Sequence, residues 1–544
     1  MKTFLLKVFL MLVAFAFGAT MLSAQDFTYG DLEYSINYDD VTVTVTGHVD
    51  GYEATGTLNI PTVAYYNGNP YTVTIIDSYA FAYCTGLTGT LVLPNTIKEI
   101  GDDAFDKCGF TGVITIPASV EDIGYTPFYG CDGIDGFVVD PANEDYDSRD
   151  NCNAVIRTYT NELKFGCKNS TIPNTVTSIA EDAFNRCTGL TSITIPSSVS
   201  FIGGYSFFFT GLTSITIPGS VGLIGVNPFG GCAALTEIVV ESSNPVYDSR
   251  NGCNAIIKTD WNEMITGCQN TVIPDDVTRI GDDAFYFCST LSGELVIPEQ
   301  ITSIGAYAFE GCTGLTGSLV IPNTVLEIGE SAFANCTGFD GRLVLSESLT
   351  TIPDWAFEEC DGFTGSLEIP DRVTSIGSSA FEGCGFNGSL TLSKSLTFVG
   401  SFAFASCSGF TDAVILAVTP PELGIYPFGG FGSTILVVPC GCVSTYENSA
   451  WHEQFTNIIE DCTAVTEAEN RSAKVYPNPI QGHVTIEAEN IQHVAIFNLI
   501  GEKVFESVAN GDAFSYDFSG FEKGLYLIRI ETKNDILTKF VTVM

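Results

Sequence analysis

A repeated sequence unit constrains the fold of this chain more than any other feature. The unit is complete in residues 295–312, where an apolar triplet ending in Pro is followed by Ile-Gly, by Ala-Phe and by a Cys three residues after the Phe. Copies of the Phe are mostly separated by 22 to 24 residues. They are Phe81, Phe105, Phe128, Phe184, Phe207, Phe229, Phe285, Phe309, Phe333, Phe357, Phe381, Phe404 and Phe428. This period is typical of leucine-rich repeats, whose coils bury their core against one another.

The residues of one unit predict the path of one coil. The triplet Leu-x-Ile is a short strand with its first and third side chains inward, and the Pro that follows closes the strand because it has no N–H donor. The Ile-Gly step turns the chain, with Gly adopting a backbone conformation that a Cβ would resist. Ala-Phe occupies a short helical or 3₁₀ turn, and its Phe stacks on the Phe of the next coil. We therefore predict a leucine-rich-repeat solenoid with a parallel β-sheet face and short helical or 3₁₀ turns opposite.

The N-terminal region contains two further segments. Residues 1–24 are typical of a signal peptide, with Lys2 and Lys7 before an apolar run and a small-residue exit at Ala24. The apolar run is too short for a membrane span, so we expect no span in the mature chain. Residues 25–76 alternate apolar and polar side chains, which predicts a β-rich cap that covers the first coil.

The solenoid is predicted over residues 77–462 and includes a C-terminal cap. Two inserts, at about 138–172 and 239–273, separate consecutive Phe residues by 56 positions and carry matching Asp-Ser-Arg sequences offset by 101 residues. A larger unit has therefore been duplicated. A short linker, 463–473, follows, and residues 474–544 form a small all-β C-terminal domain without Cys.

The coil sequence resembles the BspA-like leucine-rich repeats, a class of bacterial surface proteins, over roughly residues 77–440. The tail resembles a type A C-terminal sorting domain of the type IX secretion route. Its matching positions include Tyr476, Pro477, Asn478, Pro479, Gly501, Gly524, Tyr526 and Lys539. This resemblance implies recognition by the type IX secretion machinery and a secreted or outer cell-surface location.

Charge and histidine content narrow the function. The formal net charge is -42, from 64 acidic and 22 basic residues, and such a field repels nucleic acid and anionic membrane surfaces. No histidine lies between His48 and His452, which excludes Ser-His-Asp and Cys-His arrangements in the solenoid. No phosphate-binding or dinucleotide fingerprint is present, so we expect no catalytic residue, metal or cofactor.

The 18 cysteines allow several interpretations. Those in the repeat column, such as Cys312, are expected to be small buried core residues. Disulfides remain open for the residues that bracket the inserts or lie in the C-terminal cap, namely Cys152 with Cys167, Cys253 with Cys268, and Cys462 with Cys440 or Cys442. A zinc site formed by Cys440, Cys442, His452 and Cys462 is the less favoured alternative.

The first insert carries five acidic residues between Asp140 and Asp150, a density that could bind calcium through oxygen ligands. Its duplicate keeps only the equivalents of Asp140, Asp147 and Arg149. A structural Asp-Arg contact or a solvated loop is therefore the favoured interpretation.

The outward middle residue of each predicted strand is the candidate binding surface. This column contains Val92, Thr115, Thr194, Thr216, Val239, Val296, Val320, Val344, Glu368 and Thr391. A stripe of β-branched side chains suits contact with a partner better than catalysis, although Val and Thr also favour strands for their own sake.

Three functions are consistent with these residues. The first is an exported, non-enzymatic binding protein that engages a protein or glycan outside the cell, and the family resemblance suggests adhesion to extracellular-matrix proteins. The second is a glycan-acting enzyme that uses paired carboxylates, for which no pair stands out in the sequence. The third is a passive surface-layer or spacer protein that associates with itself.

Overall fold

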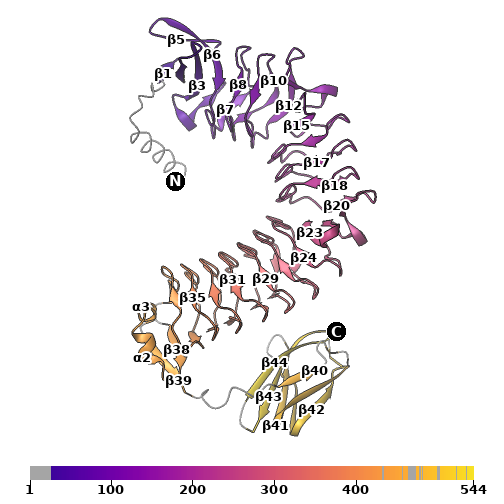
Figure 1. Cartoon of the computed structure of the whole chain (residues 1–544), viewed down its shortest axis with the longest axis vertical. Coiled ribbons are helices and arrows are strands. Elements are labelled where there is room, and N and C mark those ends of the chain that lie inside the picture. Colours follow the sequence, from indigo (N-terminus) through magenta and orange to yellow (C-terminus); the bar gives the residue numbers. More distant parts are fainter. Residues whose placement is uncertain are drawn as a thin grey trace. The chain divides into compact units, whose positions relative to one another are not determined.

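A computed structural model describes most of the chain (Figure 1). The described residues are 26–431, 434–455, 457–462, 473–476, 480, 482–498, 503–521, 523–533 and 536–543. The predicted signal peptide and all but the last residue of the predicted linker lie outside these ranges. Two compact units are present, one of residues 1–438 and 444–459 and the other of residues 439–443 and 460–544.

The N-terminal cap is a β-meander that becomes part of the repeat sheet. Buried and half-buried side chains alternate in β3 (Thr42–His48), and its buried face closes the core of the first coil. Antiparallel β1, β2 and β3 lead to β6, which pairs in parallel with both β3 and the first repeat strand, β8. The remaining bounds are β1 (Asp26–Tyr29), β2 (Leu32–Asn37), η1 (Gly51–Glu53), β5 (Val63–Tyr66), β6 (Asn69–Ile76) and β8 (Glu99–Ile100).

The predicted triplet strands form a parallel ladder, here named the Leu-x-Ile ladder. In β18 (Ser214–Ile217) the two Ile side chains are buried and the residue between them is exposed, as the period of two requires. Further strands are β10 (Gly112–Ile116), β12 (Ile134–Val139), β20 (Glu237–Val240), β28 (Leu319–Val320), β30 (Leu343–Val344), β32 (Leu367–Glu368), β34 (Ser389–Leu392), β36 (Asp412–Ile415) and β38 (Ile435–Pro439). Shorter parallel pairs involve β4 (Thr55–Gly56), β7 (Gly86–Gly89), β9 (Gly109–Phe110), β25 (Gly293–Glu294) and β27 (Leu315–Thr316).

A second set of parallel strands, here named the Ile-Gly ladder, is formed in most coils by the two residues before the repeat Gly, whose place is taken by Ala180 after β16 and by Pro353 after β31. The sequence predicts only a turn at this step, and the short strands are an addition that the structure makes. Besides β8, its strands are β11 (Asp122–Ile123), β15 (Glu162–Phe165), β16 (Ser178–Ile179), β17 (Phe201–Ile202), β19 (Leu223–Ile224), β23 (Glu263–Thr266), β24 (Arg279–Ile280), β26 (Ser303–Ile304), β29 (Glu327–Ile328), β31 (Thr351–Ile352), β33 (Ser375–Ile376), β35 (Phe398–Val399) and β37 (Glu422–Leu423).

The repeat Gly has a different role from the one predicted. At Gly305 a Cβ would lie 2.4 Å from the backbone N of Asp282 in the preceding coil, and the backbone angle φ is not in the left-handed region. Gly101, Gly203 and Gly377 meet the preceding coil at the same distance. Close approach of neighbouring backbones, rather than a special conformation, therefore requires Gly at this position.

The Ala-Phe segment forms consecutive turns in which backbone N–H groups alternate between two kinds of acceptor. The N–H of Cys312 donates to the carbonyl of Phe309 within its own turn (3.1 Å), while the N–H of Phe309 donates to Ala332 in the next coil (2.8 Å). Residues two positions before and after the Phe often adopt positive φ, for example Tyr307 at 57°. Rings of successive core Phe residues stack at 5.0 to 5.6 Å, as from Phe285 to Phe309 (5.0 Å).

The two inserts add equivalent antiparallel strands beside the Ile-Gly ladder. The first contains β13 (Tyr146–Asp147), η2 (Arg149–Asn151) and β14 (Val155–Arg157), which leads into β15. The second contains β21 (Tyr247–Asp248), η3 (Arg250–Gly252), β22 (Ile256–Lys258) and η4 (Thr259–Trp261), which lead into β23.

The C-terminal cap and the tail have separate cores. In the cap, helices α2 (Val443–Glu447) and α3 (Trp451–Gln454) bury Tyr446 and Trp451, and β39 (Asn457–Asp461) lies beside β38. In the tail, β40 (Lys474–Tyr476), β41 (His483–Phe497), β42 (Lys503–Asp517), β43 (Gly524–Thr532) and β44 (Ile536–Val543) form one sheet. A leucine-rich-repeat solenoid with a β-rich cap and an all-β C-terminal domain is thus confirmed.

Candidate binding surfaces of the solenoid

The outward column predicted from the sequence lies on the surface of the Leu-x-Ile ladder. Nine of its ten residues are exposed, with Val92 at 70% and Val296 at 73%, and Thr391 is half-buried. Register pairs them across coils: Val92 with Thr115, Thr216 with Val239, Val320 with Val344, and Glu368 with Thr391. Each coil presents the same strand position, but strand pairing runs in separate stretches, namely β10 with β12, β18 with β20, β28 with β30, and β32 through β38, while Thr194 and Val296 lie outside the strands.

Four further residues extend this column and were missed in the sequence. Asn59 pairs with Val92, Val138 pairs with Thr115, Val414 pairs with Thr391, and Val437 pairs with Val414. Val138 and Val414 are middle residues of apolar triplets that lack the Pro at the usual place, and Val437 is the middle residue of a triplet that Pro439 follows. Alternation alone could therefore have identified these three positions.

The predicted column consists almost entirely of Val and Thr side chains. Val and Thr side chains supply apolar contact and single hydroxyl groups, and Glu368 is the one ionisable residue among the ten predicted positions. Such a surface suits the extended contact of a binding interface, since catalysis would need convergent acid, base or nucleophilic groups.

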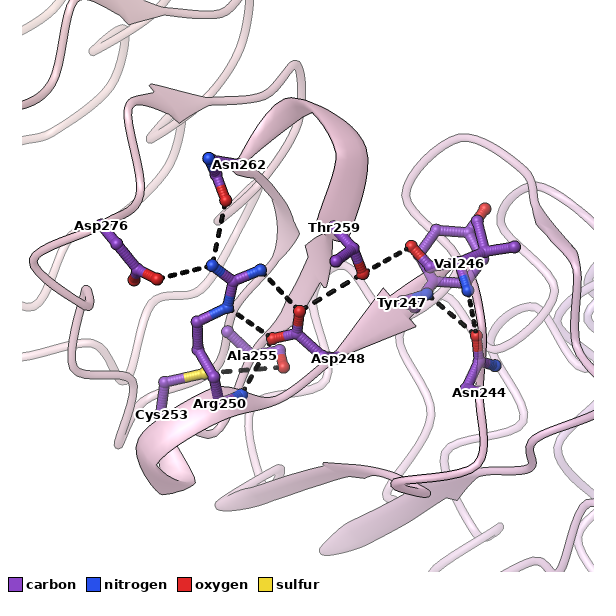
Figure 2. A network of polar contacts seen from close by, with 10 residues as sticks. All are labelled: Asn244, Val246, Tyr247, Asp248, Arg250, Cys253, Ala255, Thr259, Asn262 and Asp276. Atoms are coloured by element: carbon purple, nitrogen blue, oxygen red, sulfur yellow. Dashed lines mark hydrogen bonds and ion pairs between the residues drawn. The ribbon is translucent and has the colours of Figure 1, made fainter.

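Each insert carries a polar network, and the two copies are built alike. Figure 2 shows the network of the second copy. In the second copy, Nε of Arg250 donates to Oδ1 of Asp248 at 2.8 Å, and Nη2 donates to Oδ2 at 2.6 Å. Nη1 donates to Asn262 at 2.9 Å and to Asp276 at 2.6 Å. In the first copy Arg149 contacts Asp147 and Asn161 in the same way. The guanidinium fork ties the η3 turn to Asn262, which follows η4, and to Asp276.

The pairing with Arg lowers the pKa of the Asp side chain in each insert. Burial by itself raises the pKa of Asp248, but the hydrogen bonds and charge of Arg250 outweigh burial and lower this pKa below its ordinary value. Asp147 in the first insert behaves in the same way with Arg149. The side chain of Asp140 instead accepts a hydrogen bond from the N–H of Ala142. The Asp-Arg contact that the sequence favours is thus present in both inserts.

The cysteines around the inserts are free thiols in the structure. Cys152 and Cys253 have Sγ near the carbonyls of Ala154 and Ala255, at 3.5 and 3.8 Å, while Cys167 and Cys268 lie near Asn153 and Asn254. All four side chains are buried. Neither of the two bridges considered from the sequence is formed here.

Cys440 is joined to Cys462 in a disulfide, with their Cα atoms 4.6 Å apart. This pairing is one of the two that the sequence left open, and Cys442 keeps a half-buried free thiol. Because two of the four zinc-ligand candidates are consumed in the bridge, the Cys3His interpretation does not fit the residues. Cys440, Cys462 and Glu460 form the one group of potential metal ligands within 4.8 Å of one another among the described residues.

Repeat-column cysteines line the core. Sγ of Cys336 lies 3.0 Å from the carbonyl oxygen of Phe309, and Cys312 and Cys360 make the same contact with Phe285 and Phe333. Burial raises the pKa of these thiols well above the ordinary value. They act as small core residues and weak hydrogen-bond donors.

Sorting-motif residues are spread over the C-terminal sheet. Tyr476 ends β40 and is exposed, Gly524 begins β43, Tyr526 is buried in the same strand, and Lys539 lies in β44. Pro477, Asn478, Pro479 and Gly501 lie outside the described residues. In the described part of the chain, no helix combines the length and hydropathy that crossing a membrane requires.

Family comparisons agree with both parts of the chain. The family model of the BspA-type leucine-rich repeat region matches residues 66–149, 155–259, 262–364 and 341–422, and that of the secretion system C-terminal sorting domain matches residues 474–544.

Two curated relatives match short segments. An ulvan lyase of Nonlabens ulvanivorans is 34% identical over 92 residues, which are 16% of this chain and 16% of the lyase. An endo-acting ulvan lyase of Formosa agariphila is 37% identical over 65 residues, which are 11% of this chain and 13% of that enzyme. The chain thus spans about a sixth or less of the length of these relatives.

Similar solved structures include a leucine-rich cell-surface protein of Faecalibacterium prausnitzii, 26% identical with a TM-score of 0.43 over 72% of this chain and 95% of that one. A leucine-rich-repeat protein of Bacteroides ovatus is 21% identical with a TM-score of 0.36, over 80% of this chain and 100% of its own.

Proposed function

The chain belongs to the BspA-type leucine-rich-repeat family and ends in a secretion-system sorting domain, and from this premise we propose that it is an exported adhesin-like binding protein without catalytic activity. Its sorting domain directs it to the cell surface or the medium through the type IX secretion machinery. Its ligand is a protein or glycan outside the cell, of which an extracellular-matrix protein is the first class to test.

One observation carries this proposal: the outward residues of the Leu-x-Ile ladder form an exposed column, in which nine of the ten predicted residues are exposed. Val320 and Val344 lie opposite each other in register and both side chains are exposed. A rigid strip of apolar and hydroxyl groups loses little conformational entropy when a partner covers it, because β-branched side chains are already restricted.

The remaining two interpretations lack comparable support. A glycan-acting enzyme would need two carboxylates facing each other across a cleft, and the column offers Glu368 alone. We do not extend lyase activity to this chain from relatives that it matches over 16% of its length or less. A spacer protein would associate with itself and bind no foreign ligand.

Binding of the full exported chain to immobilised matrix proteins and to a glycan array tests the proposal. In the Val320→Glu/Val344→Glu variant, desolvated charges in the column should weaken binding by at least about tenfold. Leu223→Glu/Leu326→Glu is the matched control, since these exposed leucines lie at the Ile-Gly ladder and gain the same charge. Equal losses in both variants, turnover of a glycan, or self-association without any ligand would contradict the proposal.

A further inference from the structure

A patch of paired aromatic and carboxylate side chains lies on the turn side of the coils whose core residues are Phe285, Phe309 and Phe357. In each of these coils one side chain comes from the position two before the Phe and the other from the position after it. The pairs are Asp283 with Tyr286, Tyr307 with Glu310, and Trp355 with Glu358. We name these six residues the turn-face patch.

Backbone geometry brings the members of each pair together. The N–H of Glu310 donates to the carbonyl of Tyr307 at 3.1 Å, and the same turn bond joins Glu358 to Trp355 at 3.1 Å. In the equivalent turn one coil further on, Oγ of Ser379 donates to a carboxylate oxygen of Glu382 at 2.6 Å, which shows that side chains at these two positions touch.

Stacking of the coils then places aromatic rings beside carboxylates. Asp283 and Tyr307 occupy the same column in neighbouring coils, since the N–H of Asp283 donates to Ala306 at 2.9 Å. The rings of Tyr286 and Tyr307 meet edge to face at 6.3 Å. The next coil has only the small residues Ser331 and Ala334 at these positions, so no bulky side chain separates Glu310 from Glu358.

Among the described residues, no ion pair joins a carboxylate of the patch to a cation. Asp283 is only 8% exposed, and none of the hydrogen bonds or ion pairs of the described residues includes its carboxylate. Burial and then the charge of Asp282 raise the pKa of Asp283 to about 6, while burial, Asp283 and Glu358 raise the pKa of Glu310 to about 7. An unpaired buried carboxylate is costly, and a bound cation would remove much of that cost.

The Tyr and Trp rings of the patch indicate which class of cation it can bind. A divalent metal ion needs several oxygen ligands that converge, and the patch carboxylates do not form such a group among the described residues. Guanidinium and ammonium groups bind carboxylates and the faces of Trp and Tyr rings together. Trp355 is 36% exposed and is therefore open to such a contact.

We propose that the turn-face patch binds an Arg- or Lys-bearing segment of a partner protein. Charge complementarity supports this occupant, because the chain carries 64 acidic against 22 basic residues and cannot easily supply the cation itself. The patch is distinct from the column of the Leu-x-Ile ladder, so the two surfaces can be tested separately.

A synthetic octapeptide of alternating Arg and Gly is the probe, and the full chain carrying Trp261→Phe is the protein. Trp261 is the other exposed indole and Trp451 is fully buried, so the accessible Trp fluorescence of this variant comes from Trp355. Saturable quenching or a shift of this fluorescence by the peptide is expected. Absence of both fluorescence and calorimetric binding would overturn the proposal.

Variants separate the patch from general electrostatic attraction. Glu310→Gln/Glu358→Gln should raise the Kd of the peptide by at least about tenfold. Glu237→Gln/Glu327→Gln removes the same charge from two exposed carboxylates outside the patch and should change the Kd by less than about twofold. Equal changes in the two variants would show non-specific attraction and would overturn the proposal.

Proton release provides a second readout. The titratable groups around the patch are acids and tyrosines: Tyr205, Asp282, Asp283, Tyr286, Tyr307, Glu310, Glu330, Glu358, Glu359 and Glu382. A bound cation keeps Asp283 and Glu310 ionised, so binding near pH 6 to 7 should release protons and weaken as the pH falls. Calorimetry in two buffers of different ionisation enthalpy measures this release. No release, or displacement of the peptide by Ca²⁺ or by neutral oligosaccharides at equal concentration, would contradict a site for basic peptides.

Discussion

The hydroxyl group of Tyr247 accepts a hydrogen bond from the backbone N–H of Ile224, 3.1 Å away, where a stretch of the Ile-Gly ladder ends at β19. Tyr146 and Ile123 make the same bond at the end of β11. All four residues are buried. At the end of each stretch no further parallel strand offers a carbonyl to the last backbone N–H. A Tyr hydroxyl from the insert accepts this hydrogen bond instead.

Tyr247→Phe should lower the free energy of unfolding by about 1 to 3 kcal/mol, because the buried N–H of Ile224 would lose its acceptor. Tyr146→Phe should have a similar effect, and the two should add since the sites are far apart in the array. Urea denaturation followed by circular dichroism provides the measurement. Tyr52→Phe, on a ring that is 71% exposed, is the control and should be neutral. A neutral Tyr247→Phe would mean that the ladder end is solvated.

Gly305→Ala should destabilise the solenoid by about 1 to 3 kcal/mol, since the new methyl group would lie 2.4 Å from the backbone N of Asp282. Gly222→Ala is the matched control, because no atom lies within 4 Å of its Cβ position and its φ is not left-handed. That control should be neutral or slightly stabilising. Thermal unfolding of both variants tests the explanation that neighbouring backbones approach closely at Gly305. An equal loss of stability in the two variants would contradict this explanation.

Asp248→Asn should lower stability at neutral pH by on the order of 1 kcal/mol, since it removes the ionic fork of Arg250. The folded-state pKa of Asp248 lies below its ordinary value, so its contribution is present above about pH 4 and is lost as the pH falls through the folded-state pKa. The difference in Tm between wild type and variant should therefore shrink on acidification. Asp276→Asn is the control, because the Asp276 side chain is 57% exposed and should matter less. A pH-independent difference would rule out the charged pair as its cause.

The repeat-column thiols should resist alkylation in the native protein. Burial raises the pKa of Cys288 to about 12 and that of Cys407 to about 12, so these thiols stay protonated at about pH 8. Iodoacetamide labelling followed by peptide mass spectrometry should modify the half-buried Cys442 first. The column should react only after denaturant is added. Rapid native labelling of Cys336 would show that the core opens locally.

Several parts of the structure could be predicted because they depend on local pattern. Alternation identified the outward column, since a strand places every second side chain on the same face. The Phe period identified the stacked core, and the Asp-Ser-Arg repeat identified the equivalent inserts. The sequence limits the disulfide partner of Cys462 to Cys440 or Cys442. Because these two residues are so close in sequence, only the positions of the Cα atoms identify Cys440 as the partner.

Other parts depend on contacts between coils that a single repeat does not encode. The two-residue strands of the Ile-Gly ladder are too short to show a period, and the need for Gly305 arises from the backbone of Asp282 in another coil. The turn-face patch could not be predicted from the sequence either. Asp283 and Tyr307 are 24 residues apart in sequence and become neighbours only because their coils stack.

The sequence by itself determined the repeat architecture, the duplicated inserts and the C-terminal sorting domain of this protein, because these are carried by residue type and spacing within short segments. Only the tertiary structure decided which side chains from successive coils lie together. Stacking pairs Val320 with Val344, places Tyr247 against the N–H of Ile224, and brings Asp283 close enough for its charge to raise the pKa of Glu310. The partners, burial and pKa of these side chains depend on residues in neighbouring coils. A linear sequence does not show which residues of neighbouring coils come to lie side by side.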